Sequence, residues 1–544
     1  MASIWIEKHS IPLIAGQTLF EHADRMGVRI PASCNRDGSC HACMVHVSEG
    51  AGMLSERSPE ERFLRGGYRL ACQCRVERTD HDVHIRMLRR GRLQIAAEGC
   101  SSVQILDPWV RRGADGTVMV DGRPAGRTHG PLLGLAADLG TTTVVLRLMN
   151  LDTGHMLATH SFENPQMFAG ADVLSRIAYD GNVAHGELQR ILVAYLNHTI
   201  DTFLDSLGYR SEHIYALVVA GNPTMRDLFF GLNVQGIGHR PFQSESERLW
   251  RAGERPGSEL IERPHRLGLH MNKHGIIHGL PVIASHVGAD TAAALATLGM
   301  DRLERPVMLM DLGTNSELVI GYRDRAICAS SPAGPAFEGG SIACGMPGLE
   351  GAIQHVSING QTVQLDTIGG GEPLGICGSG LVDALGELLR TGNINMVGRI
   401  NAADGRFWFD RDRDLYLCDR DISELAQAKA ATMAGASILL EAFGISLDDL
   451  DRFYLAGGFA RYIDERQAMR IGMIPRMPVE KVEKIGNASI EGATAILCSS
   501  ELRERIHRFA QRIEHIELER HPDFFGIFVE GCQFKPFTHL QGRG

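Results

Sequence analysis

The chain has 544 residues, of which 44% are hydrophobic and 22% are charged, and it carries a formal net charge of −10 with an isoelectric point near 6.2. This length exceeds what one hydrophobic core supports and predicts roughly two to four domains, while the acidic balance favours neither nucleic acid nor an anionic membrane as a partner. The first residues lack signal-peptide features and no run of about 18 apolar residues is free of charge, so we expect a cytoplasmic protein without a membrane span.

Short strand patterns and one helical pattern fill the first ninety residues. Residues 3–7, 44–47 and 83–85 have the spacing of strands, and residues 19–26 have the spacing of a helix. Strands arranged around a single helix are typical of a β-grasp domain. We therefore expect a small mixed α/β domain over residues 1–93.

Four cysteines in this region have the spacing of an iron–sulfur site. Cys34, Cys40 and Cys43 share one loop, and Cys72 follows much later in the sequence R-L-A-C-Q-C. The plant-type ferredoxin pattern is C-x4-C-x2-C with a distant fourth cysteine, and this chain has one extra residue in the first gap. Between the first two cysteines, Gly38 and the serine after it allow tight turns that direct backbone amides toward sulfur. The pattern predicts a [2Fe–2S] cluster held by these four thiolates.

Two alternatives remain at this site. Cys74 could replace Cys72 as the fourth ligand, although the similarity of R-L-A-C-Q to ferredoxin sequences favours Cys72. A zinc site is the other alternative, but zinc sites usually pair C-x2-4-C with a second close pair, which Cys72 and Cys74 supply poorly. The cysteines beyond residue 99 are scattered without ligand spacing, so we interpret them as buried thiols.

Residues 94–130 are rich in Gly, Pro and Arg and show little sustained periodicity. Such composition is typical of a linker or a small joining segment. We expect it to separate the cysteine-bearing domain from the rest of the chain.

Two later segments, about 170 residues apart, repeat one motif. Each is an apolar strand that ends in D-L-G-T, at Asp138 and again at Asp311. The Asp can orient Mg²⁺ through water, and the amides and hydroxyls of the following turn can hold phosphate oxygens. The phosphate-binding residues expected from the two turns are Gly140, Thr141, Thr142, Gly313, Thr314 and Asn315.

Two further glycine-rich runs could serve a nucleotide. Gly457 and Gly458 follow the apolar run F-Y-L-A and would let the backbone approach a nucleoside closely. Gly378, Ser379 and Gly380 precede a predicted amphipathic helix over residues 381–389, where they would either receive an anion or simply turn the chain. We leave those two interpretations of the second run open.

The duplicated loops and the A-G-G-F run resemble the phosphate and adenosine motifs of the acetate and sugar kinase, Hsp70 and actin superfamily, whose two lobes clamp ATP between them. Together with the cysteines, the chain resembles the reductive activators of corrinoid proteins over nearly its full length. Further supporting runs are G-N-P-T-M at residues 221–225, S-P-A-G-P-A-F-E-G-G at 331–340 and G-N-A-S-I-E-G-A at 486–493. Departures at Pro223 and at residues 489–491 leave the surface that meets the substrate open.

The resemblance implies a multidomain α/β protein that uses ATP to reduce a Co(II) corrinoid to Co(I) in a partner protein of a methyltransferase system. It implies domains at residues 1–93, 131–300 and 301–544, with the linker between the first two. The implied cofactors are [2Fe–2S], ATP and Mg²⁺, and the implied partners are an upstream low-potential electron donor and a second copy of the chain in a homodimer. Glu317 and Glu338 are candidates for positioning water or Mg²⁺, together with Asp138 and Asp311 as catalytic residues.

Two rival functions are compatible with the same motifs. A small-molecule kinase fused to a ferredoxin would use the same phosphate loops, but the ferredoxin domain speaks against it. A redox sensor that binds nucleotide without turnover is the second rival, and the sequence offers it no helix-turn-helix or basic recognition stripe.

Overall fold

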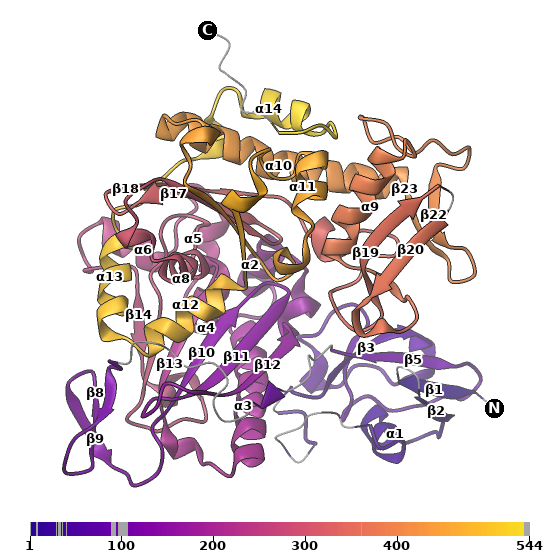
Figure 1. Cartoon of the computed structure of the whole chain (residues 1–544). Helices are drawn as coiled ribbons and strands as arrows, with labels where there is room; N and C mark the ends of the chain where they lie inside the picture. Colours follow the sequence, from indigo (N-terminus) through magenta and orange to yellow (C-terminus); the bar gives the residue numbers. More distant parts are fainter. Residues whose placement is uncertain are drawn as a thin grey trace. The chain divides into compact units, whose positions relative to one another are not determined.

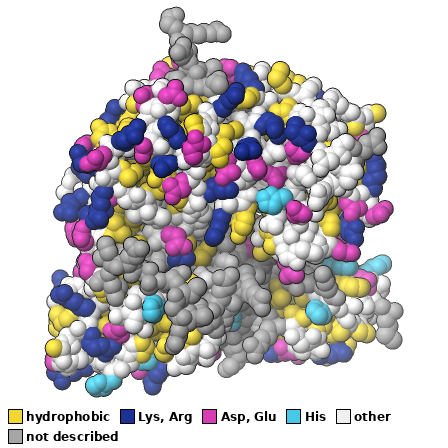
Figure 2. Space-filling view, in the orientation of Figure 1, with side chains coloured by type: hydrophobic (Ala, Val, Ile, Leu, Met, Phe, Trp, Pro, Cys, Tyr) yellow, Lys and Arg dark blue, Asp and Glu magenta, His cyan; other side chains and the backbone are white. Residues whose placement is uncertain are grey.

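The computed structural model describes residues 2–6, 9–28, 30, 34, 36–39, 41–88, 94–95, 107–360 and 362–537 (Figure 1). Its contacts divide the chain into two units, Met1–Ala293 with Gly492–His507, and Ala294–Glu491 with Arg508–Gly544. Among the described residues, no helix combines the length and apolar character needed to cross a membrane. On the face drawn in Figure 2, basic and acidic side chains are interspersed.

The N-terminal part of the first unit is a five-stranded mixed sheet in the order β2-β1-β5-β3-β4. Buried Ile4 and Ile6 alternate with partly exposed residues along the first strand, which pairs in parallel with β5. Thr18 and Glu21 form a capping box that starts the helix. The β-grasp expectation is met by the elements β1 (Ser3–Ile6), β2 (His9–Pro12), α1 (Leu19–Arg25), β3 (Met44–Glu49), β4 (Tyr68–Leu70) and β5 (Val83–Met87).

The described part of the expected joining segment contains regular structure. A three-stranded antiparallel sheet is formed by β7 (Val110–Arg112), β8 (Thr117–Val120) and β9 (Arg123–Arg127). Its second turn is Asp121-Gly122, and both residues have positive φ, the geometry that Asp-Gly favours in tight hairpins. Of the two interpretations, a linker or a small joining segment, residues 110–127 agree with the second, whereas residues 96–106 lie outside the described part.

A seven-stranded sheet in the order β14-β15-β13-β10-β11-β12-β6 forms the rest of the first unit. Its strands are β6 (Gln94–Ile95), β10 (Leu133–Leu139), β11 (Thr143–Asn150), β12 (Met156–Glu163), β13 (Ile214–Gly221), β14 (Leu260–Glu262) and β15 (Ile276–Gly279). The accompanying helices are η3 (Pro165–Ala169), α2 (Val173–Asn182), α3 (Glu187–Leu207), α4 (Pro223–Phe229), α5 (Gln235–Gly238), α6 (Glu245–Arg251) and α7 (Pro264–Leu267). Three more helices contain residues of both units, namely α8 (Ala289–Leu298), α12 (Ala488–Leu497) and α13 (Ser500–Ala510).

The second unit repeats this strand arrangement. Its main sheet has the order β25-β24-β16-β17-β18-β26, and the antiparallel run β16-β17-β18 with β24 parallel to β16 matches β10-β11-β12 with β13 parallel to β10. The strands are β16 (Val307–Leu312), β17 (Ser316–Tyr322), β18 (Arg325–Ser331), β24 (Arg452–Ala456), β25 (Val482–Gly486) and β26 (Glu514–His515). The duplicated D-L-G-T motifs thus occupy equivalent places in two equivalent sheets.

Two small sheets and four further α-helices lie in the described part of the second unit. The sheets consist of β19 (Ala352–Asn359), β20 (Thr362–Thr367) and β21 (Gly375–Ile376), and of β22 (Arg406–Asp410) and β23 (Leu415–Cys418). The helices are α9 (Gly378–Arg390), α10 (Asp419–Phe443), α11 (Glu465–Ile471) and α14 (Phe524–Gly531). Each unit has its own continuous core of buried hydrophobic side chains.

Candidate functional site

Strand pairing brings two of the four expected cluster cysteines together. Cys43 directly precedes β3, and one residue separates the end of β4 from Cys72. The two strands pair antiparallel, with Met44 opposite Leu70. The Cys43 and Cys72 sulfurs lie 3.3 Å apart. Cys34 is partly exposed, and Cys40 lies outside the described residues.

The surroundings of Cys72 suit a thiolate that binds a metal. The Gln73 amide donates a hydrogen bond to its sulfur at 3.4 Å, and Gly38, with φ of 86°, directs a backbone N–H toward it. The pKa of the Cys72 thiol falls to about 7, mainly because the Cys43 thiol donates to it. These donors fit an anionic sulfur ligand.

Cys74 has the opposite environment. Its side chain is fully buried, and burial raises the pKa of its thiol to about 12. A buried thiol of this kind is protonated and unreactive. The geometry thus supports Cys72 over Cys74 as the fourth ligand.

The first D-L-G-T turn is held by polar side chains that the sequence analysis did not single out. Asp138 is the penultimate residue of β10, and the turn follows it. Asn222 Nδ2 donates to Thr141 Oγ1 at 3.0 Å, and Asn164 Nδ2 donates to the Gly140 carbonyl at 2.8 Å. A Cβ on Gly140 would lie 2.4 Å from the Thr143 carbonyl oxygen, so the tight turn requires glycine.

A second carboxylate, Asp290, lies near Asp138. It lies partly buried at the start of α8, where its carboxylate accepts the Thr291 N–H at 2.8 Å. Burial, together with the negative charge of Asp138, raises the pKa of Asp290 to about 7. Carboxylates whose charges interact in this way could both contribute oxygen ligands to a divalent cation. The only sequence signal was the charge that Asp290 places in an otherwise apolar run.

The second D-L-G-T turn gathers the remaining acidic candidates in the second unit. Asp311 is the penultimate residue of β16 and pairs across the sheet with Glu317, so both side chains point to one face. The Thr314 hydroxyl donates a short hydrogen bond to Glu338. Asp311, Thr314, Glu317 and Glu338 therefore surround one turn, with Gly313 and Asn315 between them.

Gly457 and Gly458 follow β24, the parallel neighbour of β16. Gly457 has φ of 117°, and a Cβ there would lie 2.3 Å from the Leu312 carbonyl oxygen. Gly458 has open space around it, because a Cβ would meet nothing within 4 Å. The backbone at this turn is therefore accessible to a ligand.

Gly378, Ser379 and Gly380 begin α9 and are all buried. A Cβ on Gly378 would lie 2.2 Å from the Phe337 carbonyl oxygen, and one on Gly380 equally close to that of Ile353. These observations favour a role in close packing and chain reversal. Nucleotide contact by this run stays a prediction.

Known protein families match all three parts of the chain. Residues 6–77 match the model of the 2Fe-2S iron-sulfur cluster binding domain, residues 133–303 the RACo middle region, and residues 305–540 the C-terminal domain of RACo, the ASKHA domain. ASKHA denotes the acetate and sugar kinase, Hsp70 and actin superfamily. The matches define a class of protein in which a [2Fe–2S] ferredoxin domain precedes an actin-like fold of the kind that binds ATP.

Individual proteins are also similar to this chain. It is 32% identical over 445 residues to the corrinoid activation enzyme RamQ of Eubacterium limosum, covering 77% of this chain and 73% of RamQ. It is 23% identical to the [Co(II) methylated amine-specific corrinoid protein] reductase of Methanosarcina barkeri, covering 75% and 77% of the two chains. A solved reductive activator for corrinoid, iron-sulfur protein matches 98% of this chain and 99% of its own, with 26% identity and a TM-score of 0.71.

The chain belongs to the RACo family of corrinoid activation enzymes. This confirms the family and the fold class expected from the sequence. The individual site residues stay predictions that rest on the geometry above.

Proposed function

We propose that this protein is an ATP-dependent reductase that converts the Co(II) corrinoid of a methyltransferase partner to Co(I). One observation carries the proposal: a single chain combines the adjacent Cys43 and Cys72 sulfurs with two equivalent D-L-G-T turns in duplicated sheets. The names of its relatives, which are corrinoid activation enzymes and reductases, agree with it.

Cys34, Cys40, Cys43 and Cys72 would hold the [2Fe–2S] cluster. A cluster with such ligands supplies one electron at about −400 mV. Gly38 and Gln73 direct N–H groups to the Cys72 sulfur and would stabilise its anionic form. An upstream low-potential donor would refill the site after each transfer.

Asp138 and Asp311 would hold Mg²⁺–ATP through water, with Asp290 as an additional partner of Asp138. The turn residues Gly140, Thr141, Thr142, Gly313, Thr314 and Asn315 would bind phosphate oxygens, and Gly457 and Gly458 would approach the nucleoside. Glu317 or Glu338 would orient the water that attacks the γ-phosphate, giving ADP and phosphate.

ATP is needed because Co(II) reduction is unfavourable for this donor. Each 59 mV of unfavourable potential lowers the equilibrium constant of one-electron transfer about tenfold. Binding and hydrolysis of ATP can raise the yield if two conformations of the protein bind the corrinoid partner with different affinity. We propose that the energy of hydrolysis is used in this way, by a cytoplasmic homodimer.

The nucleotide assignment is tested by replacing each motif aspartate. Asp138→Asn and Asp311→Asn should each lower the rate of ATP hydrolysis about 100-fold or more, because each removes charge that positions the cation and the phosphates. The visible spectrum of the cluster should stay unchanged. Asp412→Asn, at an exposed position in the second unit, is the matched control. Unchanged rates of ATP hydrolysis in both motif variants would contradict the role of these aspartates in binding Mg²⁺–ATP.

A further inference from the structure

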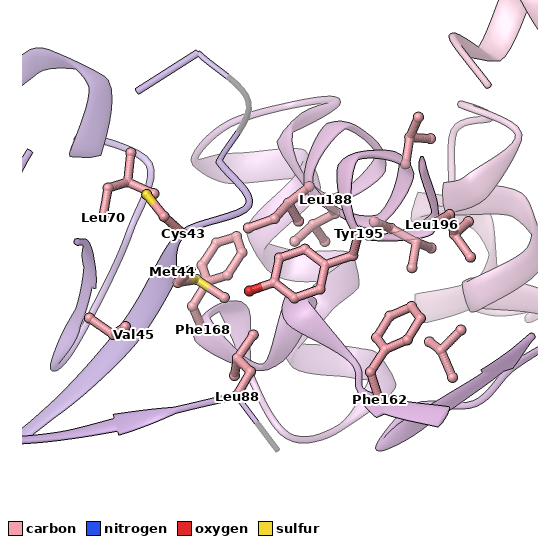
Figure 3. Packing of buried hydrophobic residues seen from close by; sticks show 14 of the residues in the cluster. Cys43, Met44, Val45, Leu70, Leu88, Phe162, Phe168, Leu188, Tyr195 and Leu196 are labelled. Carbon is pink, nitrogen blue, oxygen red and sulfur yellow. The ribbon is translucent and has the colours of Figure 1, made fainter. Parts of the chain in front are cut away.

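Within the first unit, the five-stranded sheet that carries Cys43 and Cys72 packs against the seven-stranded sheet and its helices. One hydrophobic core includes side chains of both parts. Figure 3 shows Met44 and Leu88 from the first ninety residues beside Phe168, while the Cys43 side chain points toward Leu70. All of these side chains are buried. The two parts therefore share a buried hydrophobic interface.

Three further contacts join the two parts at this interface. The Tyr179 hydroxyl on α2 donates to the Phe63 carbonyl, and the Arg65 guanidinium lies 5.2 Å from the centre of the Tyr179 ring. Arg86 on β5 pairs with Glu163 at the end of β12, with Nη1 and Oε2 2.9 Å apart. Because each hydrogen bond tolerates little displacement, these contacts restrict how the five-stranded sheet can move against α2 and β12.

A row of rings leads from this interface to the cluster loop. The Tyr179 and Phe168 rings lie 5.4 Å apart, Phe168 and Phe63 5.5 Å, and Phe63 and His41 4.3 Å. His41 lies between Cys40 and Cys43 in the sequence. A displacement of α2 or η3 would therefore change the packing around His41, two residues before the expected cluster ligand Cys43.

The same two elements hold the first phosphate turn at their other side. Asn164, the N-cap of η3, is fully buried and donates hydrogen bonds to two carbonyls of the turn. Its Nδ2 donates to the Gly140 oxygen at 2.8 Å, and its backbone N–H donates to the Thr142 oxygen at 2.8 Å. Arg176 on α2 is fully buried, and its Nη2 donates to the Thr141 carbonyl at 2.6 Å.

Arg176 also ties the two elements together. Its Nε donates to the Gly170 carbonyl at 3.1 Å and its Nη1 to Gln166 Oε1 at 3.3 Å. Burial lowers the pKa of Arg176 to about 9, which leaves the guanidinium charged near neutral pH. A buried charged donor has no water to replace a lost acceptor, so it must follow its carbonyl partners.

We propose that Asn164, Arg176 and Tyr179 are positioning residues that link nucleotide binding at the Gly140–Thr143 turn to the packing of the cluster loop. The inference rests on the proposed function. Bound phosphate oxygens would order the turn and so hold in place the carbonyls that Asn164 and Arg176 bind. Elements η3 and α2 would then pack against Phe63 in one fixed position. Nucleotide binding should therefore rigidify residues 60–70.

The test is amide hydrogen exchange of the cluster-loaded protein, with and without a saturating non-hydrolysable ATP analogue and Mg²⁺. The analogue should slow exchange in peptides covering residues 60–70 about fivefold or more, the lower end of usual coupling between sites. The circular dichroism of the cluster in the visible range should change in parallel. Tyr209→Phe, on the same lobe with Tyr209 against His213, is the matched control and should behave like the natural protein.

Tyr179→Phe removes only the hydroxyl, and Phe168→Leu independently breaks the row of rings. In both variants the analogue should still bind, but its effect on residues 60–70 and on the cluster spectrum should fall below about twofold. An unchanged effect in both variants, or bound analogue without effect in the natural protein, would overturn the inference alone. Absence of nucleotide binding would overturn the proposed function as well.

Discussion

Cys72 and Cys74 are separated by one residue but have opposite surroundings. The first lies beside another sulfur and receives hydrogen bonds, whereas the second is enclosed in the core of the β-grasp sheet. Ligation requires a thiolate, and only the first environment stabilises one.

Replacement of each cysteine should therefore have different consequences. Cys72→Ser should abolish or strongly shift the visible absorbance of the anaerobically purified protein, because a hydroxyl is a poor substitute for a thiolate ligand. Cys74→Ser should retain the cluster at full stoichiometry of iron and sulfide. Loss of the cluster in Cys74→Ser with retention in Cys72→Ser would reverse the assignment.

At the residue scale, the motif residues were predictable and their supporting residues were not. Four cysteines and two D-L-G-T turns have a spacing that shows in the sequence. Asn164, Arg176 and Asn222 act through long-range contacts to backbone carbonyls and a hydroxyl, and nothing in their local sequence reveals such partners. Asp290 was visible only as a charge in an apolar run.

At the scale of elements, the duplicated sheets were predictable because the same strand-turn motif occurs twice. The hairpins of residues 110–127 were not, since short strands joined by Asp-Gly turns resemble a polar loop in composition. The run at Gly378 showed the same ambiguity: close packing and anion binding both need glycine, and sequence alone does not separate them.

One helix contact depends on a single glycine. A Cβ on Gly492 of α12 would lie 1.8 Å from the Ala293 carbonyl oxygen of α8. Gly492→Ala should therefore lower stability by about 1–3 kcal/mol through overpacking, observed as a lower midpoint of urea unfolding. Gly526→Ala, in open space on α14, is the control and should leave the midpoint unchanged or slightly higher. Equal midpoints for Gly492→Ala and the natural protein would contradict the close contact.

A buried carboxylate joins three elements of the second unit. Glu387 on α9 accepts hydrogen bonds from Arg390 at 2.6 Å, from the Ile358 N–H of β19 at 2.9 Å and from Gln467 of α11 at 2.8 Å. The hydrogen bond from Arg390 is the largest cause that lowers the pKa of Glu387 from 4.5 to about 2.

The stabilisation by this carboxylate should depend on pH. A folded-state pKa below the unfolded value gives stability that is complete above about pH 4.5 and is lost as the pH falls toward 2. Glu387→Gln should cost about 1–3 kcal/mol near pH 7, and its effect on the unfolding midpoint should shrink below pH 4.5. Glu441→Gln, exposed on α10, is the control. A cost that stays constant down to pH 3 would show that Glu387 acts through packing alone.

At the scale of the whole molecule, one chain joins a [2Fe–2S] ferredoxin domain to the two equivalent sheets of an actin-like fold. We expect electron transfer and nucleotide hydrolysis to depend on each other. The contacts of Asn164, Arg176 and Tyr179 would give that dependence a physical route inside the first unit. A cluster near about −400 mV gives little Co(I) by equilibrium transfer, so nucleotide must raise the yield.

The most direct test of this account is the Co(I) absorbance of a cognate corrinoid protein mixed anaerobically with this protein and a low-potential reductant. Three conditions are compared: ATP with Mg²⁺, a non-hydrolysable analogue with Mg²⁺, and no nucleotide. We expect substantial Co(I) only with ATP, and none above background when Cys72→Ser replaces the natural protein. Equal Co(I) in all three conditions would separate electron transfer from nucleotide hydrolysis and contradict the account.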